Sequence, residues 1–277
     1  MRGFEFGSRT YIMGILNLTP DSFSGDGLYD DPGRAIEEAE RIIEEGADII
    51  DIGGESARPG ALPVSLEEEI KRVIPVIEKL AKKTKVPISI DTRKSEVALR
   101  ALDKGAFIIN DITGLEYDSR MAEVAARYNA GVVIMHIKGE PQTMQKSPAY
   151  GNLIKEILEK LANLIERAED SGVKKENIII DPGIGFGKTY WHNLEILNNL
   201  SAFRSLSKPI LAGVSRKSFI GNILGVSPRE RVFGTASSVA IAIKNGADII
   251  RVHDVKEMKQ VAKVADAITR NREKINA

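Results

Sequence analysis

The sequence predicts an α/β fold of the (β/α)8 TIM-barrel type, with eight parallel strands. Short runs rich in β-branched residues alternate with longer amphipathic stretches along the chain, which is typical of repeated βα units. The short runs are apolar throughout rather than at every second position, and this indicates strands buried on both faces of a parallel sheet. A length of 277 residues suits a barrel formed as one unit. We therefore predict a single domain over residues 1–277.

Eight runs qualify as strands, and each precedes a stretch with apolar residues at three- and four-residue spacing, as in a helix that packs on one face. The predicted strands are Tyr11–Asn17, Asp48–Gly53, Ile88–Asp91, Phe107–Asp111, Val132–His136, Ile178–Asp181, Ile210–Val214 and Ile249–His253. The predicted helices are Pro32–Glu45, Leu66–Lys82, Ser95–Lys104, Ser119–Tyr128, Leu153–Ser171, Leu194–Phe203, Pro228–Lys244 and Val255–Arg272.

A repeated junction supports closure of the sheet into a barrel. Gly-Ala-Asp-Ile-Ile occurs at Gly46–Ile50 and at Gly246–Ile250, and Gly-Ala-Phe-Ile-Ile at Gly105–Ile109. Each glycine stands where a helix should end, and each pair of isoleucines opens a strand. The alternative is an open doubly wound sheet, which would place a glycine-rich phosphate turn after its first strand. Asn17–Asp21 is not such a turn, so the pattern favours the barrel.

The charges are balanced, with 39 Lys and Arg against 39 Asp and Glu. No overall field therefore favours nucleic acid or a membrane surface, and any anion site has to be local. The chain has no cysteine, which excludes thiol catalysis and thiolate metal sites. No apolar run is long enough to cross a bilayer. We expect a cytoplasmic protein that acts on small molecules.

All eight predicted strands end in polar or charged residues, although their interiors are apolar. In a (β/α)8 barrel, the loops after the strands build the active site at one rim. Polar side chains that converge there are costly to desolvate unless a ligand or one another satisfies them. The strand ends are, in order, Asn17, Gly53–Gly60, Asp91–Arg93, Asn110-Asp111, His136, Asp181–Gly183, Ser215–Ser218 and Arg251–Asp254.

The residue types at this rim indicate the kind of ligand. Asp91, Asn110 and Asp181 can accept hydrogen bonds from the ring N–H and amino groups of a flat heterocycle. Cationic donors suit phosphate or carboxylate oxygens, and those of the rim are Arg58, Lys217, Arg251 and His253. An acidic floor with a basic rim predicts a nitrogen heterocycle that carries an anionic tail.

Two loops carry weaker signals. Asp181–Lys188 is glycine-rich but lacks the spacing of a Walker A phosphate loop. We interpret its glycines as allowing close approach of the backbone to a ligand, or a tight turn. Asn17–Gly27 places Phe23 among glycines and small polar residues, a composition suited to a mobile lid.

In their order along the chain, these motifs resemble the dihydropteroate synthases of the pterin-binding barrel superfamily. The resemblance covers nearly the whole chain. It is carried by Met13–Ser24, Gly53–Gly60, Ile90–Thr92, Ile109–Asp111, Met135-His136, Asp181–Lys188, Ser215–Ser218 and Arg251–Asp254. It implies an enzyme of folate biosynthesis that condenses a pterin pyrophosphate with p-aminobenzoate by an SN1-like path, with Mg2+ as cofactor. It also implies a homodimer, because the family is commonly dimeric.

The resemblance further implies roles for single residues, beginning with the pterin ring. Asp91, Asn110, Asp181, Lys217 and Arg251 match the pterin contacts of the family. Of these, Asp91, Lys217 and Arg251 are the residues that we expect to act in catalysis.

The remaining matches concern the diphosphate and the p-aminobenzoate. Asn17 matches the residue associated with Mg2+ and pyrophosphate, and Arg251 and His253 match further pyrophosphate contacts. The matches to p-aminobenzoate contacts are Phe23, Arg58, Pro59 and Ser218. Ala57 stands where many family members have a threonine whose hydroxyl binds phosphate. Ala57 has no hydroxyl for this contact, and Ser56 is the candidate to replace it.

Two other functions stay open. A methyltetrahydrofolate-dependent corrinoid methyltransferase would share the pterin floor, but it would not need Ser215–Ser218 or the Phe23 loop. A non-catalytic pterin-binding barrel would bind the heterocycle without turnover.

Single residues also have structural interpretations. Asp91 and Asp181 could cap the helices that follow them. Lys188 and Arg216 could be solvated loop charges or could tune the anion site. For the others we expect Arg93 to pair with a carboxylate, His136 to pack or to support a contact residue, and His192 to lie at the surface or cap a helix.

Overall fold

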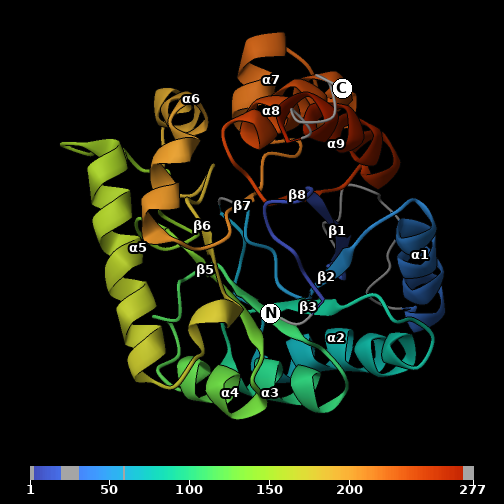
Figure 1. The fold of residues 1–277 in the computed structure, drawn as a ribbon. Coiled ribbons are helices and arrows are strands. Elements are labelled where there is room, and N and C mark those ends of the chain that lie inside the picture. The colour runs from blue at the N-terminus through green and yellow to red at the C-terminus, as the bar shows by residue number, and fades with distance from the viewer. Residues whose placement is uncertain (1–2, 20–30, 59, 271–277) are drawn as a thin grey trace.

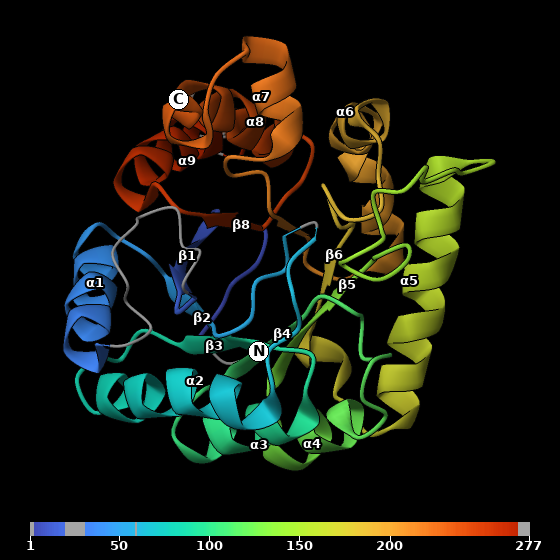
Figure 2. The same ribbon diagram turned by 180° about the vertical axis from the view of Figure 1, so that it is seen from behind.

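The computed structural model describes residues 3–19, 31–58 and 60–270. Its strands are all parallel and form one sheet in the order β6-β5-β4-β3-β2-β1-β8-β7. Figure 1 shows the strands around a common centre with the helices outside, and Figure 2 shows the same arrangement from behind. This confirms the predicted (β/α)8 barrel. The strands are β1 Tyr11–Asn17, β2 Ile49–Gly53, β3 Ile88–Asp91, β4 Ile108–Asp111, β5 Gly131–Met135, β6 Ile178–Asp181, β7 Leu211–Ala212 and β8 Ile249–Val252.

The barrel closes between β6 and β7 through few hydrogen bonds. The predicted strand Ile210–Val214 is reduced to the two residues of β7, which pair with β8. Toward β6, the described contacts are an isolated bridge between Ile180 and Ile210 and a 2.9 Å bond from Ile180 N to Pro209 O. By contrast, β1 and β2 pair along Met13–Asn17. We call the weakly joined β6–β7 interface the seam.

The helices surround the sheet, and three of them differ from the prediction. α7 was not predicted, α6 begins earlier than expected and gives way to the 3-10 helix Leu200–Leu206, and α8 is preceded by the 3-10 turn Pro228–Glu230. No helix within the described ranges is long and apolar enough to span a membrane. The helices are α1 Pro32–Glu44, α2 Leu66–Ala81, α3 Ser95–Asp103, α4 Met121–Tyr128, α5 Leu153–Asp170, α6 Tyr190–Asn198, α7 Ser218–Leu224, α8 Val232–Lys244 and α9 Val255–Thr269.

The early start of α6 follows from its cap. The hydroxyl of Thr189 accepts a hydrogen bond from His192 N, and the His192 ring accepts one from Thr189 N. This reciprocal pair satisfies two amides of the first turn, and it confirms the capping role predicted for His192. Trp191, the one tryptophan of the chain, lies 71% exposed in the same turn.

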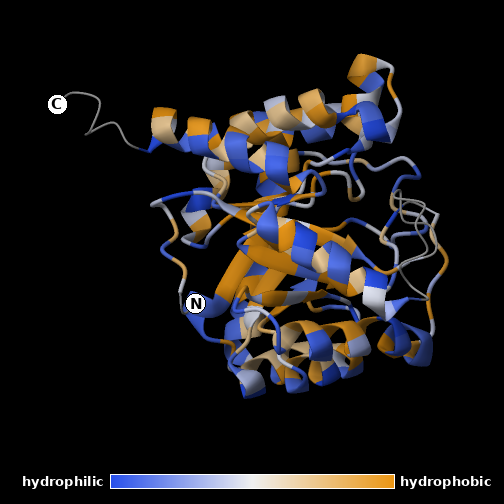
Figure 3. Cartoon of the chain, turned by 90° about the vertical axis from the view of Figure 1, so that its right-hand side faces the viewer, coloured by the Kyte–Doolittle hydropathy of each residue, from blue (hydrophilic) through white to orange (hydrophobic). Residues whose placement is uncertain are grey.

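The apolar core has two parts. The larger part lies between the strands and the helices, and Figure 3 shows the apolar strands inside a shell of amphipathic helices. The smaller part fills the barrel near the amino ends of the strands, and Phe4 and Phe6 pack against it from below. Its members are Tyr11, Met13, Ile49, Ile108, Val133, Ile179, Leu211 and Ile249. The barrel is therefore closed at this end and open only toward the carboxyl ends of its strands.

Candidate active site

The polar floor of the site begins two residues beyond the apolar layer inside the barrel. Successive side chains of a strand alternate between its two faces, so the second residue after each inward isoleucine also points inward. On β2 this places Asp51 after Ile49, and on β6 it places Asp181 after Ile179. The same step gives Asn110 on β4 and Arg251 on β8.

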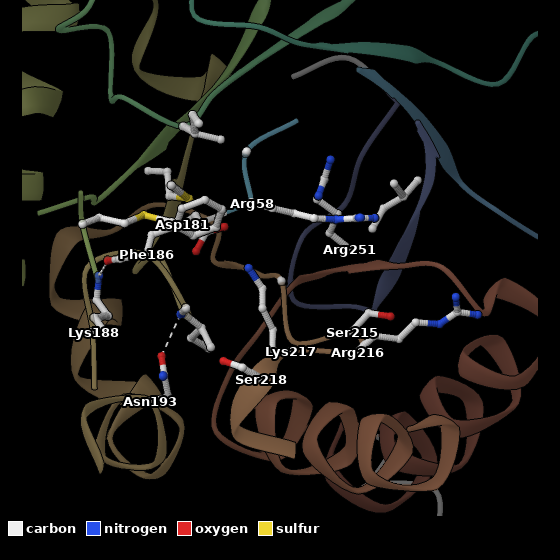
Figure 4. Close-up of a pocket in the computed structure, with 18 of the residues that line it drawn as sticks. Arg58, Asp181, Phe186, Lys188, Asn193, Ser215, Arg216, Lys217, Ser218 and Arg251 are labelled. Atoms are coloured by element: carbon white, nitrogen blue, oxygen red, sulfur yellow. Dashed lines mark hydrogen bonds between the residues drawn. The ribbon is translucent and has the colours of Figure 1, made fainter. Parts of the chain in front are cut away.

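These side chains meet at the bottom of a cavity of about 680 Å³ at the carboxyl ends of the strands. Figure 4 shows Asp181, Lys217, Arg251 and Arg58 turned toward one space. The predicted site residues that line it are Asn17, Arg58, Asn110, Asp181, Lys217, Ser218, Arg251 and His253. Asp91 lies one contact behind, against Arg251. The predicted residues Phe23 and Pro59 lie outside the described residues.

Arg251 joins two carboxylates at the floor. Its Nε donates to Asp51 Oδ2 at 2.6 Å, and its Nη2 donates to Asp91 Oδ2 at 2.6 Å. Asn110 Nδ2 donates to the same oxygen of Asp51 at 3.0 Å. Charge-assisted bonds of this kind fix geometry as well as charge. Two of the predicted pterin contacts are thus held by Asp51, which is fully buried.

Burial shifts the ionisation of the floor. It raises the pKa of Asp91 to about 7, with Asp51 and Glu69 adding to the rise and the Arg251 guanidinium opposing it. Burial also raises the pKa of Asp181, against the hydrogen bond from Gly183 N and the charge of Lys217. Strongly perturbed carboxylates in a cleft are a feature of functional sites.

Lys217 stands opposite Asp181. Its Nζ lies 4.1 Å from the centre of the Phe186 ring, where a cation is attracted to the aromatic face. Burial lowers the pKa of Lys217 to about 8, although Asp181 favours its charged form. Asp181 in turn accepts a hydrogen bond from Gly183 N at 2.7 Å. An acceptor and a donor therefore face the same part of the cavity.

Another part of the cavity lining, formed by the ends of β7 and β8, offers groups that could bind an anion. His253 was expected to act there as a cation, and the structure corrects this: burial and the charges of Arg216 and Arg251 lower its pKa to about 3. Its Nδ1 lies 3.0 Å from Ser215 Oγ. His253 is therefore a neutral group in the free site. The positive charge of this wall comes from arginine and lysine.

The loop after β7 is held by two arginines that line the cavity, Arg216 and Arg231. Arg216 has a left-handed backbone with φ of 56°, and its guanidinium pairs with Asp254. Arg231 donates to Arg216 O at 2.9 Å and to Lys217 O at 3.3 Å. Arg216 is therefore an ion-pair partner and not a solvated loop charge. The exposed Ser218 follows at the start of α7, at the cavity rim.

The sequence-based interpretation missed three contributors. Asp51 was not predicted as a site residue because it lies within a predicted strand and not at its end. An aspartate inside the apolar run Ile-Ile-Asp-Ile is unusual and could have pointed to it. Arg231 carried no motif. Lys188 is not a solvated charge, because only 2% of it is exposed. Arg93, however, pairs with Glu55 at 2.7 Å, as predicted.

Comparison with known proteins agrees with this geometry. Residues 13–253 match the family of pterin binding enzymes. The chain is 50% identical over 268 residues to a dihydropteroate synthase of Synechocystis, covering 96% of this chain and 93% of that protein. It is 48% identical to the dihydropteroate synthase of Bacillus subtilis, covering 95% and 90% of the two chains.

Solved structures give the same result. The Yersinia pestis dihydropteroate synthase in complex with a sulfonamide drug superposes with a TM-score of 0.92 at 43% identity, covering 96% of this chain and 97% of that one. The Xanthomonas albilineans dihydropteroate synthase with 4-aminobenzoic acid superposes with a TM-score of 0.88 at 41% identity, covering 95% of this chain and 94% of that one. The chain belongs to the dihydropteroate synthase family of pterin-binding enzymes, which are transferases.

Proposed function

We propose that the protein condenses 6-hydroxymethyl-7,8-dihydropterin pyrophosphate with p-aminobenzoate to give 7,8-dihydropteroate and pyrophosphate. The observation that carries this proposal is the single cavity with carboxylates at its floor and cationic side chains on its wall. A related Xanthomonas enzyme is described in complex with 7,8-dihydropteroate. The activity places the protein in folate biosynthesis.

In this proposal the floor binds the pterin ring. Asp181 and Asn110 accept from the ring N–H and amino groups, as carboxylate and amide oxygens can. Asp91 acts from behind Arg251, whose guanidinium it holds at 2.6 Å. The planar guanidinium suits stacking on the heterocycle, while Lys217 donates from the opposite side.

The diphosphate would lie along the wall near Asn17, Arg251 and His253. Stabilising the charge that develops on this leaving group is the main task of such a site. Ser56, at the cavity rim, is the available hydroxyl in the loop that carries Ala57. Arg58 and Ser218 are at the same rim, where we place the p-aminobenzoate carboxylate. Phe23 and Pro59, the other contacts proposed for p-aminobenzoate, lie outside the described residues.

We also propose Mg2+ as cofactor. No cluster of three or more His, Asp or Glu within the described ranges could hold a metal ion. Asn17 supplies one neutral oxygen at the cavity, so an ion here would take most of its ligands from the diphosphate and water, as Mg2+ commonly does. When bound, it would neutralise charge on the leaving group.

The reaction needs no side-chain nucleophile. The bond between the pterin methylene and the diphosphate oxygen breaks, and its electron pair leaves with the diphosphate. The arylamine lone pair then forms the new C–N bond, and the amine loses a proton. Asp91 and Asp181 favour the electron-deficient methylene electrostatically in this SN1-like path. Placing the reacting methylene at the bottom of the cavity would limit access of water, the competing nucleophile.

The direct test supplies the purified protein with the pterin pyrophosphate, p-aminobenzoate and Mg2+ and follows dihydropteroate by chromatography. Product that depends on both substrates is expected. Calorimetry adds the second arm, because p-aminobenzoate should bind only once pyrophosphate is present. Pterin binding without product would identify a non-catalytic pterin-binding barrel and refute the proposal.

We further propose a homodimer in the cytoplasm. Phe233 and Ile241 lie eight residues apart on one side of α8, and they are 82% and 48% exposed. Leu224 of the neighbouring α7, 48% exposed, lies beside Gly234. Exposed apolar side chains that gather on one face favour a protein interface. A cytoplasmic location fits a diphosphate substrate too charged to cross a membrane unaided.

A further inference from the structure

Lys188 is a buried cation on the wall of the cavity. It lies in the loop between β6 and α6 and is 2% exposed. Its Nζ lies 2.9 Å from His136 Nδ1, 2.9 Å from Phe186 O and 3.3 Å from His136 O. An ammonium group has three donors, and these three acceptors use them all. Lys188 therefore has no proton to offer a substrate.

The imidazole that faces Lys188 is neutral. Burial, followed by the charge of Lys188, lowers the pKa of His136 to about 3. Its Nδ1 is then free to accept from the ammonium. His136 also lines a second cavity of about 590 Å³, so the Lys188–His136 pair forms part of the partition between the two cavities.

The loop that Lys188 closes leaves no room for side chains. A Cβ on Gly183, at φ of +72°, would stand 1.8 Å from His136 O, and one on Gly187, at φ of +63°, would stand 2.3 Å from Lys138 O. Gln145, which lies in the segment after β5, donates from its Nε2 to Gly185 O at 2.7 Å. The glycine-rich loop is therefore pressed onto that segment.

Two groups of the site depend on the shape of this loop. Phe186, whose carbonyl binds Lys188, places its ring 4.1 Å from Lys217 Nζ. Gly183, packed against His136 O, donates its N–H to Asp181. Figure 4 shows Lys188 at the left, on the side of Phe186 that is away from Lys217.

We propose that Lys188 is a positioning residue for pterin recognition, which it supports by fastening the glycine-rich loop to His136 at the wall of the cavity. This inference rests on the proposed function for the identity of the ring. Its other part is electrostatic. Burial lowers the pKa of Lys188 to about 7, so below that pH its ammonium is charged and supports the ionised form of Asp181.

The charges around Asp181 set the direction of that effect. Burial raises the pKa of Asp181, and the charges of Lys217, Lys188 and Arg251 lower it. His136, which directly follows β5, is neutral and therefore adds no charge to the surroundings of Asp181. Removing Lys188 should therefore raise the pKa of Asp181, so that pterin binding is lost at a higher pH on the acid side.

The test compares Lys188→Met with Lys155→Met, which removes a lysine whose side chain is 69% exposed on α5. Binding of the pterin pyrophosphate is measured by calorimetry over a pH series, with no turnover required. We expect about tenfold weaker binding for Lys188→Met, the loss that follows from one charge-assisted contact, and an acid limb shifted to higher pH. Lys155→Met should match the parent protein in both.

A second pair keeps the test decisive if Lys188→Met does not fold. His136→Asn retains an acceptor near the place of Nδ1 and should keep most of the affinity, whereas His136→Leu should lose it. Unchanged affinity and an unchanged acid limb in a folded Lys188→Met would overturn the inference. Because binding is read separately from product, failure of the proposed reaction would appear instead as pterin binding without dihydropteroate.

Discussion

Asp51 shows how much of the site depends on one residue that touches no substrate in the proposal. It holds Arg251 through Nε and Asn110 through its amide. In Asp51→Asn, both groups keep a partner of similar size, but the Arg251 guanidinium keeps only one of its two carboxylate partners, that of Asp91. We expect pterin binding to weaken by about 1–3 kcal/mol, the cost of an imperfectly satisfied buried donor. Calorimetry measures this, and an unchanged Kd would contradict the role.

The pH dependence of the reaction follows from two residues. Asp91 has a pKa raised to about 7, so it takes up a proton, and its charge is lost, as the pH falls through that value. Lys217 has a pKa lowered to about 8, so it loses its charge as the pH rises through that value. We expect kcat/KM to peak between the two and fall on both sides, since this parameter reports groups of the free enzyme. A plateau extending to pH 5 would show that Asp91 is not needed as a carboxylate.

At the scale of the element, the seam is the part of the barrel with the least hydrogen bonding. β7 has two residues, and its link to β6 is one bridge beside the Ile180–Pro209 bond. Amides of poorly paired segments open at lower free energy than those of central strands. Residues 210–212 should therefore exchange deuterium faster than Ile49–Ile52 of β2, as measured by mass spectrometry of peptides from each. Equal protection would show that side-chain packing alone closes the barrel.

The elements also show what the sequence can and cannot predict. β1 and β6 begin and end where apolar runs meet polar residues, and their bounds were predicted, as were those of β3. α7 escaped prediction because its seven residues, Ser218–Leu224, are too few to display helical periodicity and include Gly221. β7 was predicted too long because the apolar run Ile210–Val214 continues through Gly213, whereas the pairing with β8 already stops at Ala212.

The placement of Asn110, Asp181 and Arg251 at the cavity was predictable, because each of them lies at the carboxyl end of a strand. It was not predictable where burial decides the role. Lys188 and Asp51 look like ordinary charges in the sequence, and only the packing of distant segments shows that they are enclosed. The neutral state of His253 likewise depends on its burial and on the charges of Arg216 and Arg251, all of which arise only in the folded chain.

At the scale of the whole molecule, the exposed face of α7 and α8 predicts how two copies meet. Phe233→Asp puts a charge in the middle of this face and should convert a dimer into a monomer, which light scattering coupled to size exclusion measures. Trp191→Asp is the matched control, because Trp191 is also an exposed aromatic residue but lies on α6. A parent protein that is monomeric, or a Phe233→Asp variant that stays dimeric, would refute the proposed interface.

Trp191 has a further use because it is the single indole of the chain. It stands three residues beyond Lys188, where the loop bordering the cavity enters α6. Reduced pterins absorb near-ultraviolet light in the range where indole emits, so a bound ring should quench this emission by energy transfer. Occupancy of the site can then be followed optically in the unlabelled protein, and a dye or an introduced cysteine becomes unnecessary.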